Sequence, residues 1–439
     1  MTPFEIGLIA IAALVLLVLI GLYVPIALIV CSFGAVWAIL GSPDLAGRML
    51  AQAVNETISN YYFGVIPLFV MMGFLVAESE MGQDAYDVAN GVFRKLPGGL
   101  AYGTVGANTI FAAITGISIA SAAVFTRVAV PEMLRHGYTH RFTLGLIAGS
   151  SVLGMLLPPS LLLIIYGALT EQSVGDLFIA GIMPGLLLAV LICVGVALMI
   201  RLVPAFVGAG ARRGTGERLP TRELITKLVP IVLLIVAVIG GIYSGLLTPV
   251  EAGAAGCIGA LVLGLARRKL SWVRLRRVLF ETGLITASIC FLIMAAQLYS
   301  RMLAFSQVPQ EFGNLITGAD MGFMMIMLAY VVVIILLGMI LDSSSILLIM
   351  VPIVLPIMIS MQVDLIWFGI VTIIAVEIGL LTPPLGISVM VIKATLDDPR
   401  VSLNEIFHGA FPFVLVMLVT LALVVAFPVI AVGLLGRGF

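Results

Sequence analysis

Two short segments combine residue types suited to binding a small ion. One reads GMLLPPS at 154–160 and the other GLLTPPL at 379–385. Each proline removes a backbone N–H and clashes with the preceding turn, and the residue before it is pushed out of the helical region. A helix therefore breaks at each site, and its freed carbonyls can coordinate a cation. The half-helices that restart near Ser160 and Gly386 can favour an anionic group through their free N–H groups and dipoles.

Asp342 is the strongest single candidate for ion binding. It opens the polar run DSSS at 342–345 within a long apolar stretch. A carboxylate at membrane depth is costly unless it serves an ion, a proton or a partner. Its alternative role is the N-cap of the following helix, supported by the serines. For Glu377, which precedes the second break, two roles stay open: a functional one, and a structural one in accepting N–H groups freed by the break.

The arginine, histidine and cysteine side chains are weaker candidates for binding a substrate or a metal. Arg127 could meet a substrate carboxylate, or equally extend to the membrane surface or pair with an internal acid. His136 and His140 are four residues apart, but the segment lacks the Glu of HExxH and has Gly137 between them, so we expect no zinc site. The cysteines lie singly in apolar runs and predict neither disulfides nor metal binding.

The elements that position these residues must lie in a membrane. The chain has 439 residues, 62% of them hydrophobic and 10% charged, with a mean hydropathy of +1.25. Its 22 basic and 22 acidic residues give no basic field for nucleic acid. We find no phosphate-binding loop, HExxH motif or paired catalytic carboxylates, so an enzyme or a channel is a weaker hypothesis than a transporter. The sequence predicts an all-α polytopic membrane protein.

Apolar stretches of spanning length predict the layout. Spans are expected at 4–23, 25–40, 57–79, 141–169, 177–203, 228–247, 250–266, 281–304, 363–394 and 405–435. The stretches 99–135 and 321–361 carry polar residues in their middles and predict re-entrant helical hairpins, with ordinary kinked spans as the alternative. Non-helical backbone at membrane depth must be buried in protein or line a wet cavity, so each hairpin tip should point at an internal site.

Basic residues support this layout, because short cytoplasmic loops concentrate Lys and Arg. With re-entrant hairpins, three basic segments fall on one face: Arg135 and Arg141; Arg212, Arg213, Arg218, Arg222 and Lys227; and Arg267, Arg268, Lys269, Arg274, Arg276 and Arg277. The segments 170–176, 305–320 and 362–364 fall on the opposite face and contain no Lys or Arg.

The two halves of the chain are related. Residues 154–170 and 379–395 align without gaps at an offset of 225, and five of seventeen positions are identical. Because the loop assignment sends the first copy outward and the second inward, we predict an inverted repeat. Broken helices at matching positions of inverted repeats indicate the midplane binding site of a secondary transporter.

The whole chain resembles a known family. The resemblance rests on IPLFVMMGFLVAESEMG (66–82), AAITGISIASAAVFTRVAVPEMLRHGY (112–138), GMLLPPSLLLIIYG (154–167), LFIAGIMPGLL (177–187), TPVEAGAAG (248–256), GMILDSSSILLIMVPIVLPI (338–357) and EIGLLTPPLGISVMVIK (377–393). These motifs are similar to those of the large, DctM-type membrane subunit of tripartite ATP-independent periplasmic (TRAP) transporters.

That resemblance implies a sodium-driven importer of an organic acid in a bacterial inner membrane. It implies a small four-span membrane subunit and a periplasmic substrate-binding protein as partners, and an elevator mechanism with a scaffold and a transport domain. The substrate would be a C4-dicarboxylate, a sugar acid or a keto acid. A self-sufficient sodium:organic-anion symporter of similar architecture is the alternative.

The resemblance also implies at least two sodium sites. One would lie between the first tip (Gly116, Ser118, Ser121) and the break from Gly154 through Pro158 to Ser160. The other would lie between Asp342, Ser343, Ser344 and the break from Gly379 to Pro384, with Thr382 as a ligand. Substrate contacts are expected from Ser118, Arg127, Ser160 and Gly386. Many relatives have an acidic residue in place of Ser121, which changes the charge of the first site.

Five regions are predicted on this basis. Scaffold spans occupy 1–80. The first repeat, 81–203, holds the hairpin 99–135 and the broken helix 141–169. Central scaffold spans and basic loops occupy 204–280. The second repeat, 281–395, holds the hairpin 321–361 and the broken helix 363–394, and a last span occupies 396–439.

Overall fold

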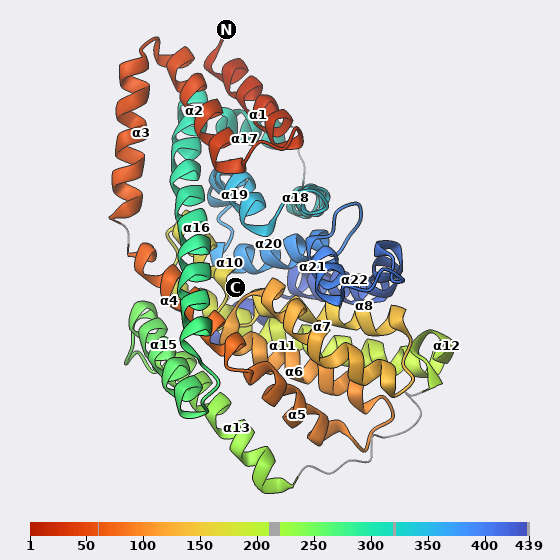
Figure 1. Cartoon of the computed structure of the whole chain (residues 1–439). Coiled ribbons are helices and arrows are strands. Elements are labelled where there is room, and N and C mark those ends of the chain that lie inside the picture. The colour runs from red at the N-terminus through yellow and green to blue at the C-terminus, as the bar shows by residue number, and fades with distance from the viewer. Residues whose placement is uncertain (60, 210–219, 319–321, 437–439) are drawn as a thin grey trace.

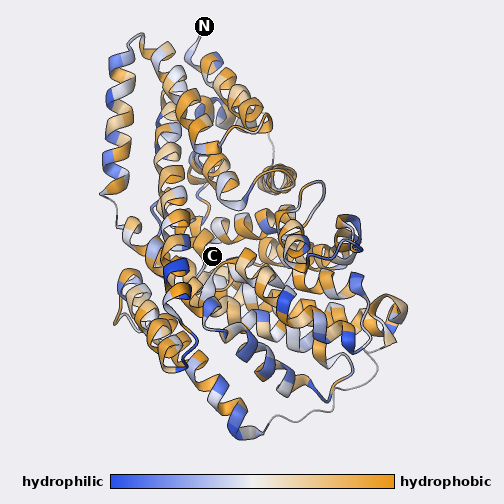
Figure 2. Cartoon of the chain, viewed as in Figure 1, coloured by the Kyte–Doolittle hydropathy of each residue, from blue (hydrophilic) through white to orange (hydrophobic). Residues whose placement is uncertain are grey.

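The computed structural model describes residues 1–59, 61–209, 220–318 and 322–436 (Figure 1). All regular elements in these ranges are helices, and apolar residues cover most of them (Figure 2). Six helices are long and apolar enough to cross a membrane, or up to eight if each bent pair counts as one span. The prediction of an all-α polytopic membrane protein is confirmed.

One group of helices surrounds the long helix α16 (Trp272–Ser306), which runs along much of the molecule (Figure 1). Helices α1 (Pro3–Leu19), α2 (Val24–Leu40), α3 (Pro43–Ile58) and α4 (Tyr62–Glu78) pack against it. Helix α15 (Pro249–Ala266) packs on α4, and α13 (Thr221–Ile235) continues through a π-helical turn (Val236–Gly240) into α14 (Gly241–Tyr243).

The remaining helices carry the predicted hairpins and broken helices. In the first half they are α5 (Met81–Phe93), α6 (Gly99–Thr115), α7 (Ser118–Arg135), α8 (His140–Ser151), α9 (Leu153–Leu156), α10 (Leu161–Thr170), α11 (Val174–Leu202) and α12 (Pro204–Val207). In the second half they are α17 (Val308–Gly318), α18 (Phe323–Gly338), α19 (Ser343–Ser360), α20 (Leu365–Leu380), α21 (Ile387–Leu396), α22 (Leu403–Ala426) and α23 (Val429–Val432), followed by a 3-10 turn (Gly433–Leu435).

Helices α6 and α7 form the first hairpin, and both of its outer ends lie beside the end of α11. A Cβ placed on Gly98 would lie 2.3 Å from Ile200, and one placed on Gly208 would lie 2.5 Å from the Gly137 carbonyl oxygen. The segment 99–135 therefore enters and leaves at one end of α11, as the sequence predicts.

Helices α18 and α19 form the second hairpin in the same way. The ring of Phe323, where α18 begins, lies 6.1 Å from that of Trp367 near the start of α20. Helix α19 ends at Ser360, and Val363 N donates to Met358 O (3.0 Å) in the short turn into α20. Both outer ends of this hairpin therefore lie at the start of α20.

The repeat extends to whole elements. The starts of α7 and α19, Ser118 and Ser343, are 225 residues apart, as are those of α8 and α20, His140 and Leu365. The packing is reciprocal: α7 lies on α21 and α19 on α10, while α22 lies on α8 and α11 on α20. Such reciprocity is the signature of a two-fold relation.

The two copies run in opposite directions. Tyr166 Oη in α10 donates to Leu365 O (2.6 Å), so the first broken helix ends where the second begins. Asp398, which follows α21, interacts electrostatically with His140 at the start of α8, so the second ends where the first begins. The repeat is therefore inverted.

The basic segments gather at one end of the molecule. Thr139 N donates to Val207 O (3.0 Å), which joins the loop after the first hairpin to the end of α12, the short helix that follows α11. An Arg267 guanidinium N–H donates to Thr226 O (3.3 Å), which joins the end of α15 to α13. These bonds bring basic segments together in pairs, as a common face requires. Of the residues in this prediction, Arg212, Arg213, Arg218 and Asp320 lie outside the described residues.

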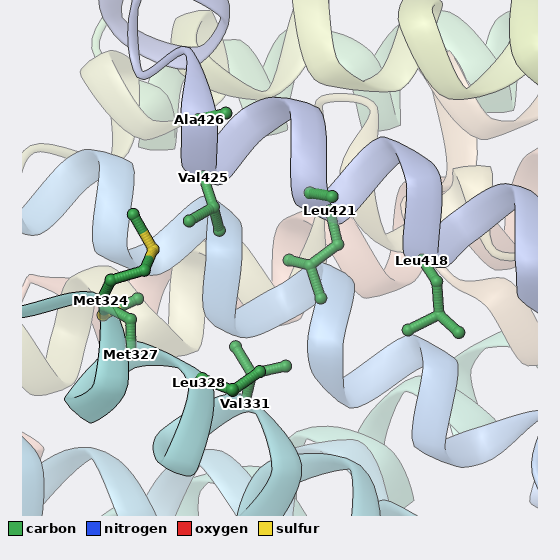
Figure 3. A pocket seen from close by; sticks show the side chains of 9 residues that line it. Met324, Met327, Leu328, Val331, Leu418, Leu421, Val425 and Ala426 are labelled. Atoms are coloured by element: carbon green, nitrogen blue, oxygen red, sulfur yellow. The ribbon is translucent and has the colours of Figure 1, made fainter.

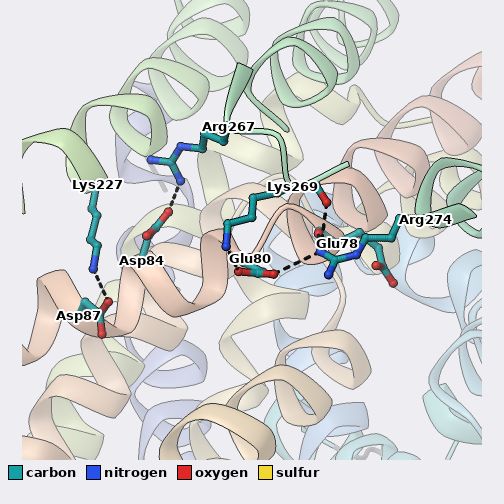
Figure 4. A network of polar contacts seen from close by, with 8 residues as sticks. All are labelled: Glu78, Glu80, Asp84, Asp87, Lys227, Arg267, Lys269 and Arg274. Atoms are coloured by element: carbon teal, nitrogen blue, oxygen red, sulfur yellow. Dashed lines mark hydrogen bonds and ion pairs between the residues drawn. The ribbon is translucent and has the colours of Figure 1, made fainter. Parts of the chain in front are cut away.

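Acidic residues of the α4–α5 corner meet this basic face (Figure 4). Lys227 pairs with Asp87 (2.6 Å), Arg267 with Asp84, and both Lys269 (2.6 Å) and Arg274 (3.2 Å) with Glu80. Helix α5, which also packs on α6, is thus joined by ion pairs to α13, α15 and α16.

Several predicted boundaries are wrong. The span 57–79 starts only at Tyr62, because residues up to Ile58 form α3. The span 405–435 ends at Ala426, because Pro428 pushes Phe427 out of the helical region. Arg274, Arg276 and Arg277 lie inside α16, whose N-cap Ser271 starts the helix earlier than expected. The polar helices α3 and α5 were not predicted, because only long apolar stretches indicate spans.

Candidate functional site

The first break separates α9 from α10. The chain bends by 41° there, around a cis Pro158–Pro159 peptide bond. Because Pro159 has no N–H, the Met155 carbonyl loses its helical donor. Ser160 replaces that donor: its hydroxyl donates to Met155 O and accepts from Leu163 N (3.4 Å), so it caps α10. Its side chain therefore closes this break.

The first hairpin tip lies directly on the break. Gly116 has a positive φ of +65°, and its carbonyl accepts from Leu161 N (3.2 Å). A Cβ on Gly116 would lie 2.0 Å from Pro159 O, and one on Gly154 would lie 3.0 Å from Ile117 C. The structure thus brings together Gly116, Gly154 and Ser160, as the first predicted site requires.

Buried polar groups without partners lie in the same hairpin. Ser118 and Ser121 are fully buried, and neither hydroxyl has a hydrogen bond to another described residue. Asn108 in α6 donates to Ser150 Oγ (2.9 Å), but its own oxygen accepts no bond from the described residues. Buried polar atoms normally have partners, so these oxygens fit ligands for an ion or water. Asn108 was not predicted, although an amide in an apolar hairpin arm is a usable signal.

The second break separates α20 from α21, with a cis Pro383–Pro384 bond. Thr382 donates its N–H to Gly379 O (2.9 Å) and its hydroxyl to Ile378 O (2.7 Å). The Leu380 carbonyl has no helical donor, because Pro383 and Pro384 lack N–H groups and Leu385 N donates instead to Met339 O (3.2 Å).

The second hairpin tip packs closely on this break, and the close contact is between two glycines. A Cβ on Gly379 would lie 2.6 Å from Gly338 Cα, at the end of α18. The bond from Leu385 N to Met339 O joins the tip to the residue just past the prolines. The two hairpins therefore meet their own broken helices in equivalent ways.

Asp342 and Ser344 point away from this break. The Asp342 side chain caps α19 by accepting from Ser345 N (3.2 Å) and from the Ser345 hydroxyl, and the residue is exposed. Asp342 and Ser344 line a groove of about 210 Å³ together with Tyr23 and Ser288, which belong to the α1–α2 corner and α16. The Asp342 side chain is therefore the N-cap of α19, as its alternative role predicted, and its role in ion binding stays a prediction.

Glu377 takes the inner position that was predicted for Asp342. It lies in the last turn of α20 and is fully buried, and neither carboxylate oxygen has a hydrogen bond of normal geometry to a described residue. The buried Ser343 side chain, at the start of α19, interacts with it electrostatically. Ser343 is thus the member of the polar run that faces the break.

The two restarting half-helices differ as anion sites. At α10, Leu161 N and Leu163 N already donate to Gly116 O and Ser160 Oγ. At α21, no side chain caps the N-terminus at Gly386, and the buried hydroxyl of Ser388 has no partner among the described residues. Of the two predicted anion sites, the N-terminus of α21 keeps the more free donors.

Arg127 is exposed on α7 and does not lie inside the hairpin. Of the alternatives open for Arg127, an exposed position agrees with a side chain that extends to the membrane surface, and a contact with substrate stays a prediction. A basic residue that the span prediction passed over, Arg301 in α16, pairs with Glu56 of α3.

A cavity of about 350 Å³ lies away from both breaks, between α18 and α22 (Figure 3). Its lining is Met324, Met327, Leu328, Val331, Leu418, Leu421, Ala422, Val425 and Ala426. All of these side chains are apolar, so the cavity offers packing surface and no ligand for an ion.

Comparison with known proteins decides the family. Residues 11–430 match the family described as the DctM component of the tripartite ATP-independent periplasmic transporter. The chain belongs to the DctM family. Its multi-span membrane character follows from this membership and from the apolar helices described above.

Relatives named as TRAP transporter large permease proteins cover almost the same length. The C4-dicarboxylate TRAP transporter large permease protein of Pseudomonas aeruginosa is 34% identical over 91% of this chain and 92% of its own. The ectoine/5-hydroxyectoine TRAP transporter large permease protein of Ruegeria pomeroyi is 31% identical, covering 97% and 98%. In fold, the chain is similar to the Alcanivorax borkumensis YdaH transporter, with a TM-score of 0.62, 14% identity, and coverage of 87% and 89%.

Proposed function

We propose that this DctM-type chain is the large permease subunit of a sodium-coupled secondary transporter that imports an organic acid across a bacterial inner membrane. The observation that supports this most is the pairing of each hairpin tip with its own broken helix, beside buried oxygens that have no partner among the described residues. That arrangement suits ion binding at the centre of an inverted repeat. The matching family and the Pseudomonas relative are named as transporter components, so we propose a transporter and not an enzyme.

Sodium would bind at the two tip–break junctions. In the first, the unpartnered hydroxyls of Ser118 and Ser121 lie in the tip region that packs on Gly154. In the second, Ser343 and the carbonyls near Gly379 and Thr382 are the candidate oxygens. Hydroxyl and carbonyl oxygens of discontinuous helices are the ligands that coupling cations use in such transporters.

The substrate would be an organic anion held at the N-terminus of α21. Free N–H groups and the dipole of a helix N-terminus favour a carboxylate, and Gly386 allows close approach because it carries no side chain. A C4-dicarboxylate is the first candidate, because the Pseudomonas relative is named for that class; a sugar acid or a keto acid stays open.

The chain would work with two partners, a small four-span membrane subunit and a periplasmic substrate-binding protein. Membership in a family described as one component of a tripartite system supports this assembly over a self-sufficient symporter. Movement would follow an elevator mechanism, with the hairpins and broken helices sliding against the group around α16. Supporting this, Asp342 and Ser344 lie across a groove from Ser288 of that group.

Uptake into proteoliposomes tests the proposal. The chain is reconstituted with its small subunit and supplied with a labelled C4-dicarboxylate, with and without the binding protein and an inward sodium gradient. We expect uptake only when both partners and sodium are present, and at least tenfold less for a Ser118→Ala, Ser121→Ala double variant. Equal uptake by the chain alone would favour the self-sufficient symporter, and uptake indifferent to sodium would contradict the coupling.

A further inference from the structure

Glu377 is the only Asp, Glu, Lys or Arg among the described residues whose side chain is buried. It lies where α18, α19 and α20 meet, beside the close approach of Gly338 and Gly379. An ionised carboxylate in such a place is costly unless a cation or several hydrogen bonds compensate it. Neither oxygen has a bond of normal geometry to a described residue, so an ionised Glu377 requires a compensating charge from outside the described side chains.

No described basic side chain is placed to compensate it. Of the helices packed on α20, α9, α10, α18 and α23 contain no Lys or Arg. Arg201 lies at the far end of α11 beside the basic face, and Lys393 of α21 donates to Asp398 O. On α22 the titratable groups are Glu405 and His408, near the start of the helix.

The N-terminus of α19 does not fill this role either. The capping carboxylate of Asp342 already compensates its partial positive charge, and it accepts hydrogen bonds from the backbone N–H and the hydroxyl of Ser345. Ser343 offers Glu377 one hydroxyl. A single hydroxyl does not balance a full negative charge in a buried site.

Comparison of the two breaks shows that the second carries more negative charge than the first. At the repeat offset of 225 residues, Ser160 corresponds to Leu385 and Val152 to Glu377. The first break therefore satisfies its freed Met155 carbonyl with a serine hydroxyl and carries no charge. The second leaves the corresponding Leu380 carbonyl without a helical donor and adds a carboxylate in the same turn.

We propose that Glu377, rather than Asp342, supplies the negative charge of the cation site at the second break, binding sodium together with the Ser343 hydroxyl. This inference rests on the proposed sodium coupling and assigns the charged ligand of one of its sites. It explains how a buried carboxylate persists without a basic partner: the coupling ion is its counter-charge.

The test compares Glu377→Gln with Asp342→Asn in the full-length chain co-purified with its small subunit. Thermal stability is measured in sodium chloride and in choline chloride at equal ionic strength, and binding of labelled sodium is titrated. In choline, we expect Glu377→Gln to be at least as stable as the wild type, because an uncompensated charge is gone. The gain in thermal stability that sodium gives the wild type should be lost in Glu377→Gln, and the affinity of this variant for sodium should fall at least tenfold. Asp342→Asn should keep the sodium-dependent stabilisation and the sodium affinity of the wild type.

Other outcomes are equally informative. A wild-type sodium response in Glu377→Gln, or loss of the response in Asp342→Asn alone, would overturn the assignment while sodium coupling stands. Lower stability of Glu377→Gln in both salts would show a structural role and would also overturn it. Absence of any sodium-specific response in the wild type would refute the coupling itself, and the inference with it.

Discussion

At the scale of single residues, glycines set how closely the hairpin tips approach the broken helices. Gly116 combines a left-handed backbone with a position in which a Cβ would lie 2.0 Å from Pro159 O. Real Cβ atoms do not approach that closely, so any other residue must move the tip. The bond from Leu161 N to Gly116 O would be lost with that movement.

We predict that Gly116→Ala destabilises the protein by more than about 2 kcal/mol, because the left-handed penalty of about 1 kcal/mol adds to a backbone clash. The matched control is Gly41→Ala, which also has a positive φ (+71°) but no atom within 4 Å of a new Cβ. Thermal unfolding and uptake are measured for both. Equal effects would show that the tip does not press on the break.

At the scale of elements, ion pairs hold α5 between the hairpin helix α6 and the helices of the α16 group. Glu80, between α4 and α5, accepts from both Lys269 and Arg274. The hydrogen bond from Lys269, followed by that from Arg274, lowers the pKa of Glu80 below its ordinary value. A depressed pKa means that the folded state favours the ionised form.

The stabilisation from Glu80 should therefore be complete above the ordinary glutamate pKa of about 4.3 and be lost as pH falls through the lower folded value. We predict that Glu80→Gln costs about 0.5–1 kcal/mol at neutral pH, since both pairs are half-exposed. The difference from the wild type, followed by thermal unfolding, should vanish on acidification. In a Lys269→Gln, Arg274→Gln background the substitution should have little effect at any pH.

The two breaks leave backbone carbonyl oxygens without the N–H donors that a continuous helix would provide. We predict that Pro383→Ala with Pro384→Ala restores N–H donors and lets α20 continue toward α21. Sodium-dependent uptake should fall at least tenfold while the protein stays folded. Pro131→Ala, an exposed proline inside the continuous helix α7, is the control and should keep uptake. Wild-type uptake by the double variant would contradict a functional break.

At the scale of the whole molecule, transport by an elevator mechanism requires the hairpins to slide past α16. The groove lined by Ser288 of α16 and Ser344 of the second tip lies across that boundary. A link between these two residues would hold the tip in one position. The group around α16 would then be unable to move relative to the repeats.

We predict that a Ser288→Cys, Ser344→Cys pair, joined by a short reducible cross-linker, stops uptake, and that reduction restores it. The native cysteines, Cys31, Cys193, Cys257 and Cys290, are first replaced. A control pair within the α16 group is Leu68→Cys with Cys257 retained, since the Cys257 thiol donates to Leu68 O (2.8 Å). Uptake that survives the first cross-link would argue against sliding at this boundary.

The sequence by itself determined the membrane class, the two hairpins, the two breaks and the inverted sense of the repeat. Each depends on local chemistry: apolar length, the missing N–H of proline, and the placement of Lys and Arg. The polar helices α3 and α5 escaped prediction, because ion pairs and packing against distant helices hold them and no apolar run marks them.

Only the tertiary structure decided which side chains face each break. Asp342 of the second hairpin tip and Glu377 before the second break are both acids in apolar sequence, yet one caps a helix at a groove and the other is fully buried. The sequence left three roles open for Arg127, and the structure places it exposed on α7. A residue's direction from a helix depends on which neighbour covers that face, and the packing of α18, α19 and α20 fixes this through contacts far apart in the chain.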